Sequence, residues 1–186
     1  MLNKIKKHYS IIILSIILII WTGLVFYFSP VKIVQFLGIT NSYLIIFLLS
    51  FFGGTSIIIA FPYYLFVIIL GAGGLNPLLL GLAAGTGVIL GDSISYLVGL
   101  KGKTVLPNFL QNKFKRLHNW LLNGPPLLIP GFLFLYGAFI PIPNDIIVIP
   151  LGLAQYPYFK LIIPLGFGNI LFNIMLASLG YYRLII

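Results

Sequence analysis

The sequence predicts an all-α integral membrane protein built on an inverted repeat. Each repeat unit is a re-entrant helical hairpin followed by a long transmembrane helix, and the two units insert from opposite sides. An N-terminal transmembrane helix and a cytoplasmic amphipathic helix complete the predicted single membrane domain. Three observations support it: the composition, the spacing of the charged residues, and a proline break that occurs twice.

The composition excludes an ordinary soluble domain. Of the 186 residues, 60% are hydrophobic and only 7% are charged, whereas a soluble domain carries about 25% charged residues. Cysteine is absent, which rules out disulfides and thiolate metal sites. The net charge of +9 comes from basic residues at the ends of apolar runs, where they orient helices and meet anionic head groups. We therefore expect membrane lipids, and not nucleic acid, as partners.

The first apolar run predicts a transmembrane helix over residues 9–29. A signal peptide has an apolar core of about 7–15 residues and small residues at its cleavage site. This run is longer, and Trp21, Tyr27 and Phe28 stand where small residues would be needed. The basic residues before it predict a cytoplasmic N-terminus by the positive-inside rule. The expected location is the plasma membrane, with several crossings.

The next basic cluster begins at Lys101, and the charge rule requires an odd number of crossings before it. Residues 77–100 supply one transmembrane helix of ordinary length. Residues 43–75 are interrupted at Pro62, and we expect a re-entrant hairpin with its tip at that proline. A backbone break at membrane depth is tolerated only where protein or a water-filled cavity shelters it. A kinked spanning helix with an imperfect charge rule is the alternative.

Residues 103–123 predict an amphipathic helix in the cytoplasmic interface. Apolar side chains recur there at three- and four-residue spacing, and polar and basic side chains fill the other face. This pattern is typical of helices that lie on a membrane surface. Lys113, Lys115 and Arg116 form the predicted surface for anionic lipid head groups.

The second half of the chain repeats the first. Residues 127–156 predict a second re-entrant hairpin, broken at Pro141 to Asp145, and residues 159–182 predict a second long helix. Pro143 follows Pro62 by 81 residues. The same offset pairs Val67 with Val148, Gly71 with Gly152, Gly85 with Gly166, Gly87 with Gly168, Gly99 with Gly180, Asp92 with Asn173 and Tyr64 with Asp145.

An inverted repeat has consequences for the site. Transporters of this design place their site near the midplane, where broken helices from the two repeats meet. We therefore expect the two proline breaks to face each other, and the glycines to allow close helix packing. The predicted transport site comprises Pro62, Tyr63, Tyr64, Asp92, Pro141, Pro143, Asn144, Asp145 and Asn173.

Both acidic residues of the chain lie in apolar segments. An Asp at the centre of a spanning helix costs about 2.5–3.5 kcal/mol on insertion scales and is functional by default. Asp145, beside Asn144, is the stronger candidate and could accept a proton, hold a cation or meet a polar head group. Capping of the half-helix after Pro143 is its structural alternative. For Asp92, a contact with Asn173 would be mainly structural.

Enzyme chemistry is poorly supported. The histidines, His8 and His118, lie in basic interfacial segments, and neither an HExxH motif nor a GxSxG nucleophile elbow is present. Two carboxylates and scattered amides make a poor metal site. We expect no catalytic residues, no cofactor and no metal.

Several motifs resemble the DedA family, also called the VTT or SNARE-associated Golgi protein family. The first-half motifs are Gly71-Ala72-Gly73-Gly74-Leu75-Asn76-Pro77, Gly85-Thr86-Gly87-Val88-Ile89-Leu90-Gly91-Asp92 and Tyr96-Leu97-Val98-Gly99. The second-half motifs are Phe139-Ile140-Pro141-Ile142-Pro143-Asn144-Asp145, Gly152-Leu153 and Tyr156-Pro157-Tyr158. The resemblance covers roughly residues 50–180.

The resemblance implies two opposed re-entrant loops whose tips form the transport site. It also implies lipid movement: scrambling in eukaryotes, and in prokaryotes recycling of the undecaprenyl phosphate carrier lipid and a link to the proton-motive force. Our first hypothesis is therefore a lipid transporter or scramblase. A proton- or ion-coupled transporter of a small solute and a membrane scaffold are the alternatives, and a homo-oligomer is compatible with each.

Overall fold

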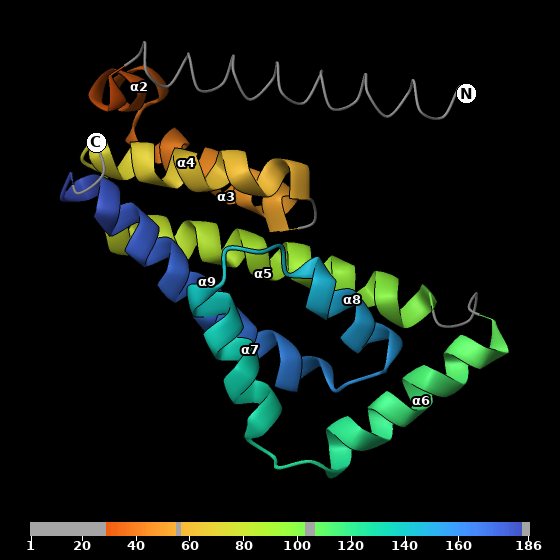
Figure 1. Ribbon diagram of the computed structural model, residues 1–186. Helices are drawn as coiled ribbons and strands as arrows, with labels where there is room; N and C mark the ends of the chain where they lie inside the picture. The colour runs from red at the N-terminus through yellow and green to blue at the C-terminus, as the bar shows by residue number, and fades with distance from the viewer. Residues whose placement is uncertain (1–28, 55–56, 103–106, 184–186) are drawn as a thin grey trace, which may run out of the picture.

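The computed structural model describes residues 29–54, 57–102 and 107–183, and all its regular elements in these ranges are helices (Figure 1). The predicted helix over residues 9–29 lies outside them, except for its last residue. The described helices are α2 (Pro30–Leu37), α3 (Ile39–Gly54), α4 (Ile57–Ala72), α5 (Pro77–Gly102), α6 (Asn108–Asn123), α7 (Leu128–Phe139), α8 (Asp145–Leu153) and α9 (Tyr158–Tyr181).

Two of these helices, α5 and α9, are long and apolar enough to cross a membrane. They contain 26 and 24 residues, and a span needs about 20. Both occupy the ranges predicted for the long helices. The start of α5 follows from its sequence, because the Asn76 side chain accepts hydrogen bonds from two first-turn amides and Pro77 fits the first helical position. The all-α class is thus confirmed for the described residues, and two of their helices are suited to crossing a membrane.

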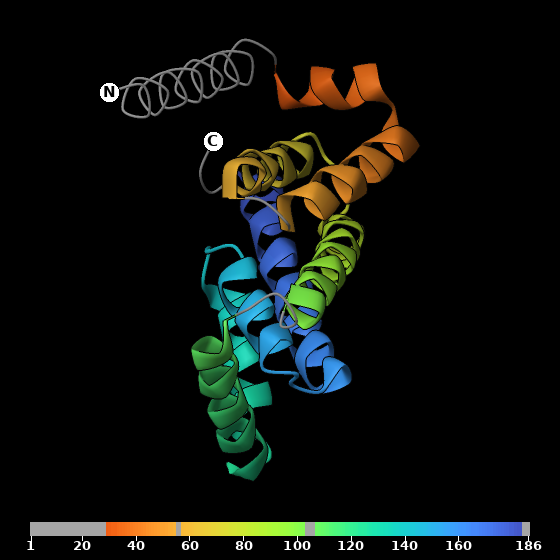
Figure 2. The ribbon, with the colours of Figure 1, turned by 90° about the vertical axis from the view of Figure 1, so that its right-hand side faces the viewer.

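The shorter helices pack on these two. Helix α3 packs on α5 and α4 packs on α9, while α7 packs on α9 and α8 packs on α5. Each long helix therefore contacts one helix from each half of the chain. In the side view of Figure 2, α9 passes through the middle, with α5 on one side and α8 on the other.

The sequence predicts a helix break at Pro62, but the structure has no break there. Helix α4 begins at Ile57 and includes Pro62, and the helix before it, α3, ends at Gly54. Gly53 and Gly54 end α3, and glycine has weak helix propensity. Proline is tolerated inside membrane helices, and Pro150 and Pro164 also lie within helices here. Proline alone was therefore a misleading signal.

The second break lies where the sequence predicts it. Helix α7 ends at Phe139 and α8 begins at Asp145, so the intervening residues hold Pro141 and Pro143. The Tyr136 hydroxyl spans the break, donating toward the carbonyls of Ile142 (3.4 Å) and Pro143 (3.3 Å). This contact ties the non-helical segment to the preceding helix.

Helix α6 rests on the second half through its apolar face. Leu121 is buried, and Phe114 and Leu117 pack against a core cluster shared by α7, α8 and α9. His118 Nδ1 lies 2.7 Å from the Ala154 carbonyl oxygen, after α8. Side-chain contacts along α6 therefore hold the amphipathic helix against the second half, in addition to the chain connections at its ends.

Candidate functional site

A fully buried carboxylate lies where three elements meet. Asp92, on α5, has no exposed surface. Its Oδ2 atom accepts hydrogen bonds from Asn144 Nδ2 at 2.8 Å and from Asn169 Nδ2 at 3.2 Å. Asn144 stands just before α8 and Asn169 is on α9, and the Asn144 amide also approaches Asn169 Oδ1 at 3.2 Å. We call these three residues the Asp92 network.

The Asp92 network explains why Asn144 does not cap α8. Asn144 holds the N-cap position, where an Asn side chain usually accepts from the first-turn amides, but it makes no capping hydrogen bond. Its amide instead donates to Asp92, and the residue is buried. The second break is therefore fixed to the long helix of the first half.

Polar contacts continue along α9 toward α4. Asn173 is fully buried, and its amide donates to the Asn169 carbonyl at 2.8 Å. The Tyr63 and Tyr64 rings have centroids 4.4 Å apart, and Tyr64 meets Phe172 edge-on at 5.3 Å. Tyr63 and Tyr64 thus approach the same stretch of α9 from the first half of the chain.

Three side-chain oxygens in this region are buried and have no hydrogen-bond partner among the described residues. They are Asp92 Oδ1, Asp145 Oδ1 and Asn173 Oδ1. A buried polar atom without a partner costs about 1–3 kcal/mol, and more if it is charged. The site is therefore energetically costly, which is typical of functional sites.

Glycines bring the long helices together around this region. A side chain at Gly81, Gly85 or Gly166 would strike Ile174, Ile170 or Ile89, respectively, on the opposite long helix. Residues with higher numbers on α5 contact residues with lower numbers on α9, so the two helices pack antiparallel (Figure 1).

The glycine contacts also occur in matched pairs. Gly71 abuts the backbone of Ala177, while Gly152 abuts that of Tyr96. Gly99 abuts the backbone of Ile149, while Gly180 abuts that of Ile68. Each glycine in the first half corresponds to the paired glycine 81 residues later. The residues that they contact are related by the same offset in the opposite direction, from Ala177 back to Tyr96 and from Ile149 back to Ile68.

The predicted site residues are gathered only in part. Asn144 and Asp92 are in direct contact, and Asn173 is linked to them through Asn169. Asp92 bonds to Asn144 and Asn169, and its expected partner Asn173 bonds elsewhere.

Other predicted residues lie apart from the Asp92 network. Asp145, the first residue of α8, is partly buried, Pro143 is partly buried and Pro141 is exposed. The Pro62 side chain lies outside the described residues. Lys113, Lys115 and Arg116 are exposed on α6.

Sequence reasoning missed Asn169. A signal was available, because Asn169 lies four residues before Asn173 and therefore on the same face of α9. Two Asn residues on one face of an otherwise apolar helix indicate a polar partner on the neighbouring helix. Asp92 is that partner.

The described residues contain no group of three His, Cys, Asp or Glu side chains placed to hold a metal ion. No protein-family model, curated protein or solved structure matches the chain.

Proposed function

We propose that the chain is a membrane lipid transporter or scramblase of the DedA/VTT type, and not an enzyme. A phospholipid or polyprenyl-phosphate head group would cross beside the Asp92 network while its tails remain in the bilayer. The observation that carries the proposal is the buried Asp92 carboxylate, which joins the second helix break to both long helices. Ionisable residues in membrane segments mark substrate or ion pathways by default.

The internal repeat is the second line of support. The matched glycine contacts and the antiparallel packing of α5 and α9 are what an inverted repeat of residues 50–180 would produce. In that arrangement Asn173 and Tyr63 are the counterparts of Asp92 and Asn144. The site would then lie at the pseudo-twofold axis, as in other inverted-repeat transporters. We place the protein in the plasma membrane with its N-terminus in the cytoplasm.

The proposal is tested by reconstitution. Purified protein is placed in liposomes that carry a fluorescent phospholipid in one leaflet, and its exchange is followed by chemical quenching. We expect exchange well above that of empty liposomes. A rate equal to that of empty liposomes, for labelled phosphatidylcholine, phosphatidylglycerol and a polyprenyl phosphate alike, would rule out lipid transport.

A proton- or ion-coupled transporter of a small solute is the second candidate. It is favoured by Asp92 Oδ1, which is buried without a partner and is chemically able to take a proton or a cation. This candidate predicts solute uptake that depends on a proton or sodium gradient and is lost in Asp92→Asn. Lipid exchange that proceeds equally with and without a gradient would favour the scramblase.

A further inference from the structure

An apolar groove opens between the amphipathic helix and the second hairpin. Its volume is about 730 Å³, within the range of about 300–1,000 Å³ that is usual for small-molecule sites. Its walls come from the C-terminal part of α6 and from α7 and α8. They include Trp120, Leu128, Phe132, Leu135, Ile147 and Leu151.

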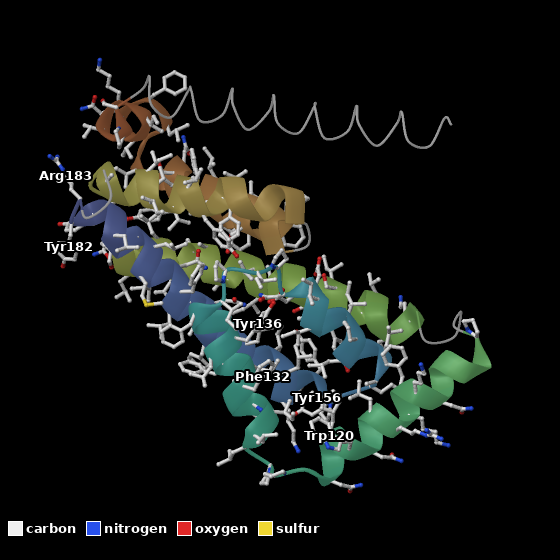
Figure 3. The ribbon with its side chains drawn as sticks, viewed as in Figure 1. Trp120, Phe132, Tyr136, Tyr156, Tyr182 and Arg183 are labelled. Carbon is white, nitrogen blue, oxygen red and sulfur yellow. The ribbon has the colours of Figure 1, made fainter. Side chains whose placement is uncertain are left out.

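The buried core residues Leu121, Leu133 and Leu151 form the floor of the groove, and exposed side chains form its outer walls. Trp120 is 61% exposed, and Leu128, Phe132 and Leu135 are also exposed. Trp120 stands on α6 and Phe132 on α7, near the end where the two helices join (Figure 3). Tryptophan is enriched at the membrane–water interface, where its ring sits at head-group level. The groove therefore suits a chain that is apolar along its length and polar at one end.

Two basic residues lie on the same side of α6 as Trp120, which lines the groove. At 3.6 residues per turn, Lys113 and Arg116 lie within about 40° of Trp120 around the α6 axis. Lys115 lies about 140° away, on another side of the helix. All three are exposed. The positive charge beside the groove thus comes from Lys113 and Arg116.

We propose that this groove binds one acyl chain of an anionic phospholipid, whose phosphate is held by Lys113 and Arg116. The site is separate from the Asp92 network, and it would exist whether or not the bound lipid is the one transported. Arginine binds phosphate through a bidentate fork and lysine binds it as a point charge. Trp120 would lie at the level where the chain meets the head group.

The chain is suited to a direct test, because it has only two tryptophans, Trp21 and Trp120. In a Trp21→Phe background, Trp120 is the only tryptophan. The full-length protein is reconstituted in phosphatidylcholine vesicles that contain a low fraction of lipid brominated on its acyl chains. Bromine quenches tryptophan on contact, so quenching reports occupancy of the groove. The brominated lipid is phosphatidylglycerol in one series and phosphatidylcholine in the other.

Brominated phosphatidylglycerol is expected to quench Trp120 at a several-fold lower mole fraction than brominated phosphatidylcholine. Each basic residue near an anionic lipid contributes about 1 kcal/mol. Together the two residues are enough to account for a several-fold preference, so the double change Lys113→Ala, Arg116→Ala should abolish it. The matched control Lys115→Ala should keep it. Gly131→Leu should weaken quenching by both lipids, because Gly131 lines the groove and a Cβ there meets no atom within 4 Å.

Three outcomes would overturn the proposal. Equal quenching by the two brominated lipids would mean general contact with the bilayer. A loss in Lys115→Ala equal to that in the double variant would mean surface charge without a site. Weak quenching by both lipids, together with a cross-linked dimer, would mean that a second copy covers the groove. Lipid exchange is measured separately, so failure of this inference is distinguishable from failure of the proposed function.

Discussion

Asp92 sits in a position that is expensive for a carboxylate. It is fully buried, only one of its oxygens is hydrogen-bonded, and both of its donors are neutral amides. Neutral donors compensate a buried charge less well than a cation does. A carboxylate in such a position is better explained by function than by stability.

Replacement of Asp92 should separate its charge from its hydrogen bonds. In Asp92→Asn the side-chain carbonyl can still accept from Asn144 and Asn169. In Asp92→Ala the Asn169 amide loses its acceptor, and the Asn144 amide keeps only Asn169 Oδ1. Because an unsatisfied buried group costs about 1–3 kcal/mol, we expect Asp92→Ala to be less stable than Asp92→Asn by about 2 kcal/mol or more. Unfolding in mixed detergent micelles measures the difference. Equal stabilities would mean that the hydrogen bonds of the Asp92 network contribute little.

Asp145 and Asp92 show what the sequence could and could not predict about the site. The sequence placed both acids in apolar segments and ranked Asp145 first because of its proline break. The structure buries Asp92 completely and leaves Asp145 partly exposed. Which of the two carboxylates is more deeply buried depends on how the helices pack. The local sequence pattern does not contain that information.

At the scale of helices, periodicity and length predicted more than the breaks did. The ranges of α5 and α9 follow from long uninterrupted apolar runs, and α6 follows from its amphipathic spacing. The sequence pattern predicts the first break at Pro62, whereas α3 ends at Gly53 and Gly54 and Pro62 lies inside α4. Both signals are local, and tertiary packing decides which one interrupts the helix.

The paired glycines give a prediction about helix packing. A Cβ at Gly99 or Gly180 would meet the backbone of α8 or α4, which cannot move aside as a side chain can. Gly99→Ala and Gly180→Ala should therefore each lower the free energy of unfolding by about 1–3 kcal/mol. If the two contacts are equivalent, the two losses should be similar. Unfolding of each variant in detergent measures the cost.

Gly131→Ala is the matched control for these variants. A Cβ at Gly131 meets nothing within 4 Å, so this change should be neutral or stabilising by up to about 1 kcal/mol through helix propensity. A loss at Gly131 equal to the losses at Gly99 and Gly180 would show that glycine flexibility, and not close approach, sets the cost.

If bulky changes at Gly85 and Gly166 abolish assembly while both Asp→Asn changes are silent, the scaffold alternative is favoured.

At the scale of the molecule, the inverted repeat predicts that equivalent positions face opposite sides of the membrane. Leu78 and Phe159 are 81 residues apart, lie in the first turns of α5 and α9, and are 56% and 71% exposed. Because the chain has no cysteine, single Leu78→Cys and Phe159→Cys variants can be labelled without background. In sealed cells, a membrane-impermeant maleimide should label Leu78→Cys and spare Phe159→Cys until the cells are opened. Labelling of both from outside would contradict opposed insertion.

The central claim is that Asp92, at the meeting of the two halves, is the acid on which transport depends. The most direct measurement is the rate of lipid exchange in liposomes for wild type, Asp92→Asn and Asp145→Asn at matched protein content. We predict that Asp92→Asn lowers the rate at least about tenfold, equivalent to about 1.4 kcal/mol in the barrier, and that Asp145→Asn has a smaller effect. Retention of the wild-type rate by Asp92→Asn, with exchange above that of empty liposomes, would contradict the claim.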